Sequence, residues 1–588
     1  MKLKPNLTVT CLLLLLKCIC LKAIGQPLQN YSVYKLENKI GTERITEQKT
    51  ATGATYSTII QTNDRGSKLA LSATLTLTNN QPVAYMSEGN TSRSGRETID
   101  TSFTSVKSFP VSNSGSIKIK ELLVAYWDSN GRPEQLGSLL EGQLITIHML
   151  DTLLIPVTNE QVTVLELVKG NHPNEIIWIT KEGRAVFLAA VDTEGDKREI
   201  ISDQYNAWFD FFTKKSTEYL VKTYKDHNKT LGASFASIAI LGGNVIDIMN
   251  GGKLIENCMV LIKNGKINYI GKIDRTIVPA DAYLLNAEKK FIIPGLWDMH
   301  AHVFHPDGLK SALHSGVTSI RDMANEFDFI NKIELLTRDG RLPSPTLYRA
   351  GIIEGKSADG LGNVRASTSA EIAAEVKMYH EAGFNQIKVY SKVSKKNIAV
   401  ISDLATRYKM DMVGHIPDVT TLKYCIENGM KSISHVHYFM NSLKWNNSDF
   451  VHENQALIDL LKNKGVYVDA TLNVYSGFED YKMKNYKRVT KFLFDQGIPV
   501  VAGTDNGKIG EEISLLVSAG LSPLDAIRSA TIVPARIMKA DAHSGSIDKG
   551  KDADLLILSA NPLVDIKNIE KINSVIKGSF ILDIHKIN

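Results

Sequence analysis

Hydrophobic and polar positions follow two different patterns along this chain of 588 residues. Between about 290 and 540, short apolar runs alternate with segments such as 369–382 and 418–428, where charged and apolar residues recur at helical spacing. Regular alternation of strand and helix indicates a parallel sheet with crossover helices, and roughly 250 residues suit an eight-stranded barrel. We therefore predict an α/β fold with a (β/α)8 TIM barrel over residues 291–540.

The second pattern, over residues 27–230, is alternation of apolar with polar or threonine-rich positions between Gly, Asn and Asp turns. It marks the segments 31–45, 54–64, 67–79 and 115–128. The pattern predicts an antiparallel β domain, and residues 205–225 are expected to form a helix that leads out of it. This domain has no cluster of histidines or carboxylates suited to catalysis. It is therefore either an accessory domain or a curved sheet that binds an apolar ligand.

Residues that could bind a metal ion stand where the apolar runs of the predicted barrel end. His300 and His302 follow one such run, and residues two apart on a strand project from the same face, so both imidazoles can reach one ion. Later apolar runs end at further candidates, which are Lys388, His415, His435 and Asp505. The carboxyl ends of barrel strands meet at one mouth, where catalytic groups lie. This pattern favours a metal site at the mouth.

The motifs around these residues, taken in order, resemble those of the amidohydrolase superfamily of metal-dependent hydrolases. They are DMHAH at 298–302, GVTSIRDM at 316–323, IKVY at 387–390, GHIP at 414–417, SISH at 432–435, AGTD at 502–505, GLSPLDAIRSATIVPAR at 520–536 and GSIDKGKDADLLIL at 545–558. The resemblance covers about residues 235–588 and points to the imidazolonepropionase-like and Xaa-Pro dipeptidase (prolidase-like) branch. It implies a small composite β-sandwich built from both flanks of the barrel, residues 236–290 and 541–588.

The resemblance also implies a set of metal ligands. His300, His302 and Asp505 would bind one ion, while His415 and His435 would bind a second. Zinc is expected for imidazole and carboxylate ligands with an open position for water, at two Zn²⁺ per chain. Manganese, cobalt or iron would fit the same ligands.

Lys388 resembles the family lysine that carbon dioxide converts into a carbamate, whose two oxygens can bridge two ions. Burial and nearby cations favour the neutral amine that this reaction needs. A hydroxide shared by the ions would attack a carbonyl carbon, and Asp505 would carry the proton to the leaving group. Tyr390 would donate a hydrogen bond to the oxyanion, although a tyrosine at a strand end also packs locally.

The expected activity is hydrolysis of an amide or peptide C–N bond in a small substrate, such as a dipeptide or an N-acyl amino acid. The substrate itself stays open, because loops select it, and one of them is a polar insertion at 471–491. If Lys388 is an unmodified buried lysine, the chain is instead a mononuclear cyclic-amide hydrolase or deaminase. A catalytically inactive binding protein is the third alternative.

Other polar residues near these motifs have two interpretations. His437 would be a substrate contact or a loop histidine, and His305 and His314 are weaker candidates. Arg321 and Asp322 close an apolar run; they would orient a ligand or bind a substrate carboxylate, or simply form an internal ion pair.

The composition of the chain limits the kinds of molecule that it is expected to bind. The formal net charge is +5 without a basic block, so nucleic acid is not expected to bind, and the expected partner is a small molecule or short peptide. No apolar segment is long enough for an integral membrane span. The sequence is compatible with a homo-oligomer.

Residues 1–25 have the pattern of a secretory signal peptide. Lysines precede the apolar run 11–20, and a stretch of small residues ends at Gly25, where cleavage is expected. We therefore expect a secreted or periplasmic protein. Cleavage would leave Cys258 and Cys425, which lie in distant predicted elements, so no structural disulfide is expected.

Overall fold

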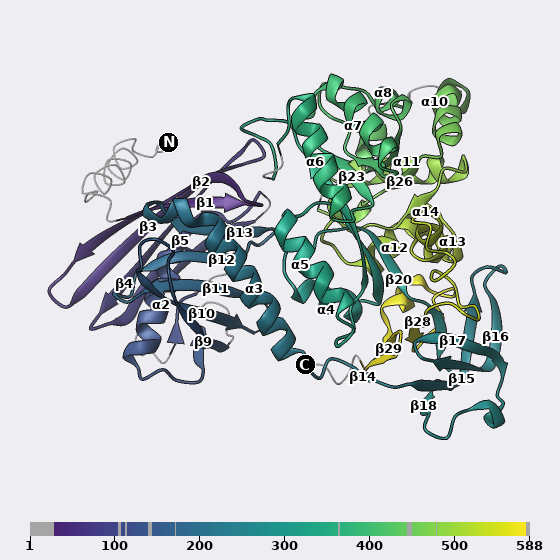
Figure 1. Ribbon diagram of the computed structural model, residues 1–588, viewed down its shortest axis with the longest axis horizontal. Coiled ribbons are helices and arrows are strands. Elements are labelled where there is room, and N and C mark those ends of the chain that lie inside the picture. The colour runs from purple at the N-terminus through teal and green to yellow at the C-terminus, as the bar shows by residue number, and fades with distance from the viewer. Residues whose placement is uncertain are drawn as a thin grey trace, which may run out of the picture. The chain divides into compact units, whose positions relative to one another are not determined.

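The computed structural model divides into two compact units, of which the first ends at Ser216 and the second begins at Thr217 (Figure 1). The predicted signal peptide, residues 1–25, lies outside the described residues. The structure describes residues 29–93, 95–103, 108–111, 115–138, 144–170, 172–362, 365–440, 442–443, 450–477 and 479–583.

The described residues of the first unit form a 13-stranded sheet in the order β6-β5-β4-β3-β2-β1-β13-β12-β11-β10-β9-β8-β7. Neighbouring strands are antiparallel except for β7 and β8, so the predicted antiparallel β domain is confirmed. The strands are β1 (Gln29–Lys35), β2 (Asn38–Lys49), β3 (Gly53–Asp64), β4 (Ser67–Thr78), β5 (Gln81–Asn90), β6 (Arg96–Ser102), β7 (Ser108–Phe109), β8 (Leu136–Ser138), β9 (Leu144–Leu154), β10 (Gln161–Lys169), β11 (His172–Thr180), β12 (Ala185–Val191) and β13 (Lys197–Ser202).

One predicted strand of this unit is wrong. The segment 115–128 is not a strand but the helix α2 (Ile117–Ser129), whose N-cap Ser116 accepts the backbone N–H of Lys118. Both ends of the sheet contribute to one apolar core with α2, so the helix is buried on nearly every side. A helix without a solvent face shows no polar stripe at helical spacing, and the alternation at its start therefore resembled a strand. The predicted helix over 205–225 is confirmed as η1 (Asp203–Trp208) and α3 (Phe209–His227).

The second unit contains a parallel barrel. Its eight described strands pair in chain order from β20 to β27, and backbone N–H groups of Met299 and Asp505 donate to Ala502 and His300, which joins the last strand to the first. The predicted TIM barrel is confirmed in this form. The strands are β20 (Leu296–Ala301), β21 (Val317–Asp322), β22 (Thr346–Ile353), β23 (Gln386–Val389), β24 (Asp411–Gly414), β25 (Met430–Ser434), β26 (Tyr467–Asp469) and β27 (Val500–Val501).

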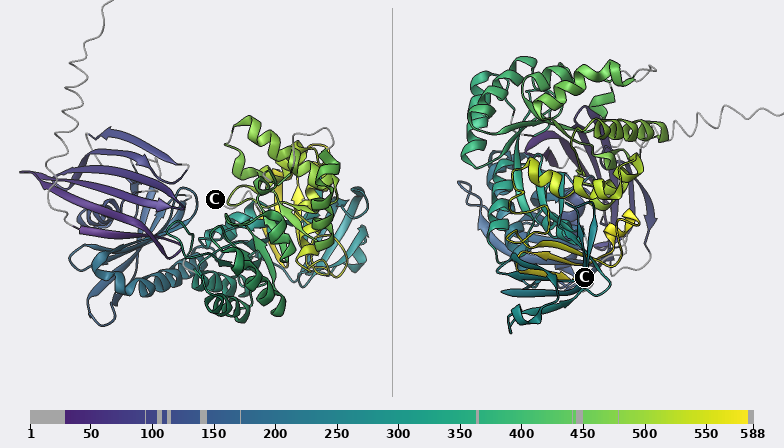
Figure 2. Two further views of the ribbon diagram at one scale, coloured as in Figure 1. Left: turned by 90° about the horizontal axis from the view of Figure 1, so that it is seen from above. Right: turned by 90° about the vertical axis from the view of Figure 1, so that its right-hand side faces the viewer.

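Helices connect these strands, as Figures 1 and 2 show. The expected helix 369–382 is α6, with a capping box between Thr368 and Glu371, whereas the expected helix 418–428 is shortened to α8 because Thr421 caps it. The helices are α4 (Asp307–His314), α5 (Phe327–Arg338), α6 (Ser369–Glu381), α7 (Lys395–Arg407), α8 (Leu422–Glu427), α9 (His437–Met440), α10 (Phe450–Lys464), η3 (Leu472–Tyr475), α11 (Asp480–Asp495), α12 (Ile509–Ala519), α13 (Pro523–Ser529) and α14 (Ile532–Ile537).

Strands from both flanks of the barrel join in one further sheet. Its order among the described residues is β14-β30-β29-β28-β19-β15-β16-β17, with β18 beside β15. The two flanks meet where β19 pairs antiparallel with β28. That this sheet forms a sandwich stays a prediction. The strands are β14 (Ala233–Ser234), β15 (Ser237–Asp247), β16 (Lys253–Lys263), β17 (Lys266–Lys272), β18 (Tyr283–Asn286), β19 (Phe291–Pro294), β28 (Asp554–Leu558), β29 (Ile572–Lys577) and β30 (Phe580–Asp583).

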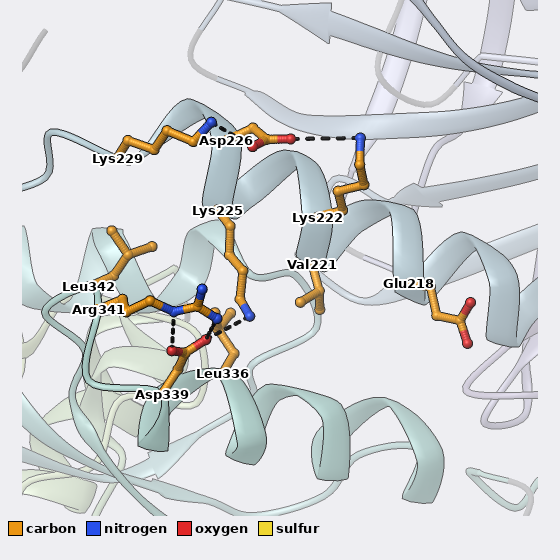
Figure 3. A pocket seen from close by; sticks show the side chains of 10 residues that line it. All are labelled: Glu218, Val221, Lys222, Lys225, Asp226, Lys229, Leu336, Asp339, Arg341 and Leu342. Atoms are coloured by element: carbon orange, nitrogen blue, oxygen red, sulfur yellow. Dashed lines mark hydrogen bonds and ion pairs between the residues drawn. The ribbon is translucent and has the colours of Figure 1, made fainter.

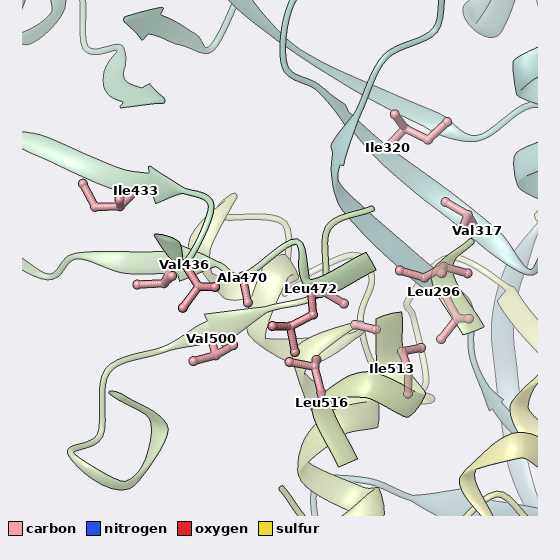
Figure 4. Close-up of a cluster of buried hydrophobic side chains, with 14 of the residues drawn as sticks. Leu296, Val317, Ile320, Ile433, Val436, Ala470, Leu472, Val500, Ile513 and Leu516 are labelled. Carbon is pink, nitrogen blue, oxygen red and sulfur yellow. The ribbon is translucent and has the colours of Figure 1, made fainter. Parts of the chain in front are cut away.

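The largest apolar core lies between the barrel strands and their helices (Figure 4). Leu296 and Val500 of the strands share it with Ile513 and Leu516 of α12, and all four are almost fully buried. Burial of this kind fixes α12 against the barrel. Cys258 on β16 and Cys425 on α8 are buried free thiols. None of the described helices combines the length and hydrophobicity that a membrane crossing requires.

Candidate metal centre

The six predicted metal ligands lie at the carboxyl ends of the barrel strands. His300 and His302 lie at the end of β20, and Lys388 lies on β23. His415 and His435 directly follow β24 and β25, and Asp505 follows β27. Since parallel strands of a barrel end at the same mouth, residues far apart in the sequence come together there.

Three of these side chains form one group. The Nε2 of His302 lies 3.2 Å from Oδ1 of Asp505, and the Nε2 of His300 lies 3.7 Å from the same oxygen. One ligand atom from each residue lies within 4.8 Å of the others. Gly503 permits this approach, because a Cβ there would lie 2.7 Å from the Cβ of His300. The group has the nitrogen and oxygen donors that a divalent ion such as zinc prefers.

The other predicted ligands lie beside this group. The Nε2 atoms of His415 and His435 are 3.1 Å apart, and Oδ2 of Asp505 lies 3.8 Å from the Nε2 of His435. The Nζ of Lys388 is 3.3 Å from the Nε2 of His300. Asp505 therefore faces both groups of histidines through its two oxygens.

On the side away from Asp505, the Nδ1 atoms of three imidazoles have a hydrogen-bond partner. Nδ1 of His302 lies 2.9 Å from the carbonyl oxygen of Ala324 and must donate to it, so its Nε2 presents a lone pair to Asp505. Two acceptors 3.2 Å apart need a proton or a cation between them. Nδ1 of His415 lies 3.2 Å from the Oγ of Ser391, and Nδ1 of His435 lies 2.7 Å from Oγ1 of Thr471. Nδ1 of His300 lies 3.3 Å from Oδ2 of Asp469 but forms no hydrogen bond with it. Partners of this kind orient imidazoles toward a metal.

Burial controls the charges of the site. It lowers the pKa of His300 and His415 well below the usual value and that of His435 to about 4, so these rings are neutral at pH 7. Burial also lowers the pKa of Lys388 to about 8. Although burial alone would raise the pKa of Asp505, the neighbouring histidines hold it well below its usual range. The site therefore offers neutral imidazoles and an ionised carboxylate, the protonation states that metal binding requires.

Several positioning groups were not found from the sequence. Asp298 accepts hydrogen bonds from the backbone N–H of His300 at 3.0 Å and of Thr504 at 3.1 Å, and from the Thr504 hydroxyl at 2.6 Å. It thereby joins the chain before Asp505 to the strand that carries His300. The position of Asp298 at the start of the DMHAH motif is the feature of the sequence that could have identified it.

Arg321 belongs to a buried network beneath the site. It is fully buried, forms an ion pair with Asp469 and donates to the hydroxyl of Tyr467 at 2.7 Å. Asp322 accepts the backbone N–H of Val303 at 2.7 Å. The internal ion pair expected for Arg321 is present, with Asp469 as the partner. Its guanidinium has no exposed surface, so it does not bind a substrate carboxylate.

Tyr390 lies beside the site, with its ring centroid 4.2 Å from that of His415. His437 begins α9, and its Nδ1 contacts the hydroxyl of Tyr475 at 2.7 Å, so it has a local partner. His305 pairs with Asp307 at 3.2 Å, and His314 lies in the last turn of α4. Neither of these two histidines is in the group around Asp505.

The first unit contains an acidic cluster that the sequence did not predict. Asp64, Asp192 and Asp196 surround the buried Nζ of Lys35 at 2.7, 3.1 and 2.6 Å, and Arg65 lies 3.2 Å from Asp196. The ammonium of Lys35 lies where an ion would bind. The cluster is therefore explained as a buried salt-bridge network.

A hollow of about 490 Å³ lies between α3 and α5 in the second unit (Figure 3). Lys225 donates to Asp339 at 2.8 Å, and Arg341 contacts the same carboxylate at 2.6 Å. Asp226 pairs with Lys229 at 2.9 Å. These cations are bound by carboxylates, so the hollow offers no additional site for an anion.

Comparison with known proteins agrees with this geometry. Residues 291–580 match the model of the amidohydrolase family. Ochratoxinase of Aspergillus niger is 22% identical over 433 residues, which cover 58% of this chain and 85% of the relative. Imidazolonepropionase of Thermoplasma volcanium is 22% identical over 383 residues, which cover 56% of this chain and 91% of the relative. The solved structure of molinate hydrolase has a similar fold, with a TM-score of 0.51 and 20% identity. The match covers 60% of this chain and 96% of the molinate hydrolase chain.

The family match spans the barrel and the strands after it, and the barrel mouth gathers imidazoles, a lysine and an aspartate that can hold a divalent metal ion. The chain belongs to the amidohydrolase superfamily and is a hydrolase of carbon–nitrogen bonds.

Proposed function

We propose that this chain is a binuclear metal-dependent amidohydrolase that cleaves the C–N bond of a small acylated amine, such as a dipeptide or an N-acyl amino acid. The observation that carries the proposal is the position of Asp505, whose two oxygens face His302 at 3.2 Å and His435 at 3.8 Å. A carboxylate between two groups of imidazoles is suited to hold two cations close to one water molecule.

The residues fit two divalent ions. His300, His302 and Asp505 would hold one, and His415 and His435 the other. Imidazole and carboxylate donors favour zinc. Lys388 lies 3.3 Å from the Nε2 of His300, and burial lowers its pKa to about 8, which favours the neutral amine more than in an exposed lysine. A neutral amine is the form that carbon dioxide converts into a carbamate.

The chain's own residues would move the proton. When bound, the metal ions supply an activated water and polarise the substrate carbonyl. Asp505 is ionised at neutral pH and can accept the proton that the water loses on addition to the carbonyl carbon. It then passes that proton to the nitrogen as the C–N bond breaks, so a carboxylic acid and an amine leave. Tyr390, beside His415, would donate a hydrogen bond to the developing oxyanion.

The first experiment measures metal ions per chain in protein purified without chelators, for wild type and Lys388→Ala, with bicarbonate present. Two ions falling to one or fewer in the variant would support the carbamate bridge. Hydrolysis is then followed on dipeptides that end in proline and on N-acyl amino acids. One ion in both proteins would favour the second candidate function, a mononuclear cyclic-amide hydrolase or deaminase. The similarity to imidazolonepropionase supports this second candidate.

We also propose that the chain is secreted or periplasmic, with residues 1–25 removed as a signal peptide, and that residues 27–230 act as an accessory domain. N-terminal sequencing of the protein expressed with its own leader is expected to begin near Gln26. A mature protein that still begins at Met1 would contradict this.

A further inference from the structure

A buried carboxyl group outside the predicted ligand set holds the loop after β26. Glu512 of α12 is fully buried, and its Oε1 and Oε2 accept the backbone N–H groups of Leu472 at 3.0 Å and Asn473 at 2.8 Å. The side-chain amide of Asn473 also donates to the carbonyl oxygen of Lys508, the N-cap residue of α12, at 3.1 Å. Helix α12 therefore fixes the start of η3 at three points.

These contacts stabilise an unusual backbone conformation. Thr471 has φ 47° and ψ 46°, the left-handed region that a β-branched residue rarely adopts. After such a residue, the next two N–H groups point into one concave space that binds an anion. The two oxygens of the Glu512 side chain fill that space and accept both N–H groups, so they offset the strain at Thr471.

The conformation of Thr471 determines how its hydroxyl meets His435. Oγ1 of Thr471 donates its one proton to the carbonyl oxygen of Ala470 at 2.9 Å. It can therefore only accept from Nδ1 of His435, which lies 2.7 Å away. This contact keeps the proton of His435 on Nδ1, and the lone pair of Nε2 faces His415 at 3.1 Å.

We propose that Glu512 is a positioning residue for His435, acting through the amides of Leu472 and Asn473 and the hydroxyl of Thr471. It thereby sets the affinity of the metal ion that His415 and His435 bind. This inference rests on the proposed function, in which His435 is a metal ligand. Glu512 thus links α12, a helix that supplies none of the predicted metal ligands, to His435.

The test uses Glu512→Gln and Thr471→Val in the full chain, with Thr471→Ser as the conservative variant. Glutamine keeps the shape but turns an NH₂ group toward a backbone N–H, and valine removes the acceptor for His435. Zinc affinity is measured by competition with a chromogenic chelator. We expect both variants to weaken the affinity of one zinc site by about 10–100-fold and to leave the other site unchanged. Loss of a hydrogen bond that orients a metal ligand typically has an effect of this size. Thr471→Ser keeps the hydroxyl and should bind zinc as wild type does.

Two further variants separate positioning from loss of stability. Glu43 is another fully buried carboxylate, which accepts the backbone N–H of Ile117 in the first unit at 3.3 Å. Glu43→Gln should unfold at lower denaturant concentration yet bind both zinc ions as wild type does. The double variant Glu512→Gln/Thr471→Val should be no weaker than Thr471→Val alone, because both changes act on one contact. Additive losses of affinity would contradict the proposal.

The variant His435→Ala shows whether a negative result contradicts the positioning role of Glu512 or the proposed function itself. If His435→Ala leaves both zinc sites intact, His435 is not a ligand and the proposed function fails. If His435→Ala weakens one site while Glu512→Gln and Thr471→Val bind both ions normally, the positioning role alone is overturned. Should Glu512→Gln not fold, Glu512→Asp takes its place, because it keeps the carboxyl group but draws it back from the amides of Leu472 and Asn473. Normal binding of both zinc ions by Glu512→Asp would then overturn the positioning role.

Discussion

The Nε2 atoms of His415 and His435 lie 3.1 Å apart, although the two residues follow different strands of the barrel. Burial lowers the pKa of both rings, so both are neutral near pH 7. Thr471 accepts the Nδ1 proton of His435 and directs its Nε2 lone pair into the gap. Two neutral nitrogens in this arrangement are suited to share a cation.

His415→Ala is therefore expected to lower the metal content from two ions per chain to one. Activity should fall more than about 100-fold, since loss of a ligand exceeds the usual cost of losing an outer contact. Elemental analysis of purified protein measures the metal. His437→Ala is the matched control, because His437 contacts Tyr475 instead and should keep both ions. Equal metal content in all three proteins would exclude His415 as a ligand.

Asp505→Asn should retain the fold and lose turnover. The amide keeps the shape of the side chain but cannot accept the proton, so kcat is expected to fall by about 10²–10⁴-fold. Steady-state kinetics on the best substrate found measures this, with circular dichroism to check the fold. Full turnover in Asp505→Asn would refute the proton transfer assigned to this residue.

Arg321→Met should destabilise the barrel strongly. Arg321 and Asp469 are both fully buried, and removing the cation leaves a buried unpaired carboxylate, at a cost of about 3–5 kcal/mol in the free energy of unfolding. Burial already raises the pKa of Asp469 to about 6. Urea denaturation measures the loss. Arg341→Met breaks the ion pair of a mostly exposed arginine with Asp339 and should cost far less, because solvent screens such a pair. Similar losses in both variants would contradict the network.

In the metal-free protein, Glu512 should make stability depend on pH. Burial raises its pKa from 4.5 to about 8, with smaller contributions from Asp298 and Asp469. A carboxyl with a raised pKa in the folded state stabilises the fold below its unfolded pKa and loses that contribution as pH rises through about 8. Wild type should therefore lose more unfolding free energy than Glu512→Gln between about pH 5 and 8.5. Urea denaturation across this range tests it, and parallel pH profiles would rule it out.

The barrel and the positions of the predicted ligands could be found from the sequence, because both depend on local order. Apolar runs and helical segments alternate, and His300, His415 and Asp505 each stand where a run ends. The structure brings these side chains together, while their roles as metal ligands stay a prediction.

The contacts that orient the ligands could not be found, because they join residues that no spacing relates. Thr471 meets His435 across 36 positions, and Glu512 meets Leu472 across 40. The polar insertion at 471–491 gave no sign that it begins with a left-handed threonine and continues as the helix α11. Helix α2 was missed for a related reason, since burial on all sides removes the stripe that marks a helix.

The central claim is that two metal ions lie between the histidines and Asp505. The most direct test is a crystal structure of protein purified with zinc and bicarbonate, with diffraction recorded on both sides of the zinc absorption edge. We predict two anomalous peaks, one beside His300, His302 and Asp505 and one beside His415 and His435, with added density on Nζ of Lys388. A single peak with an unmodified Lys388, or no peak among these residues, would contradict the account.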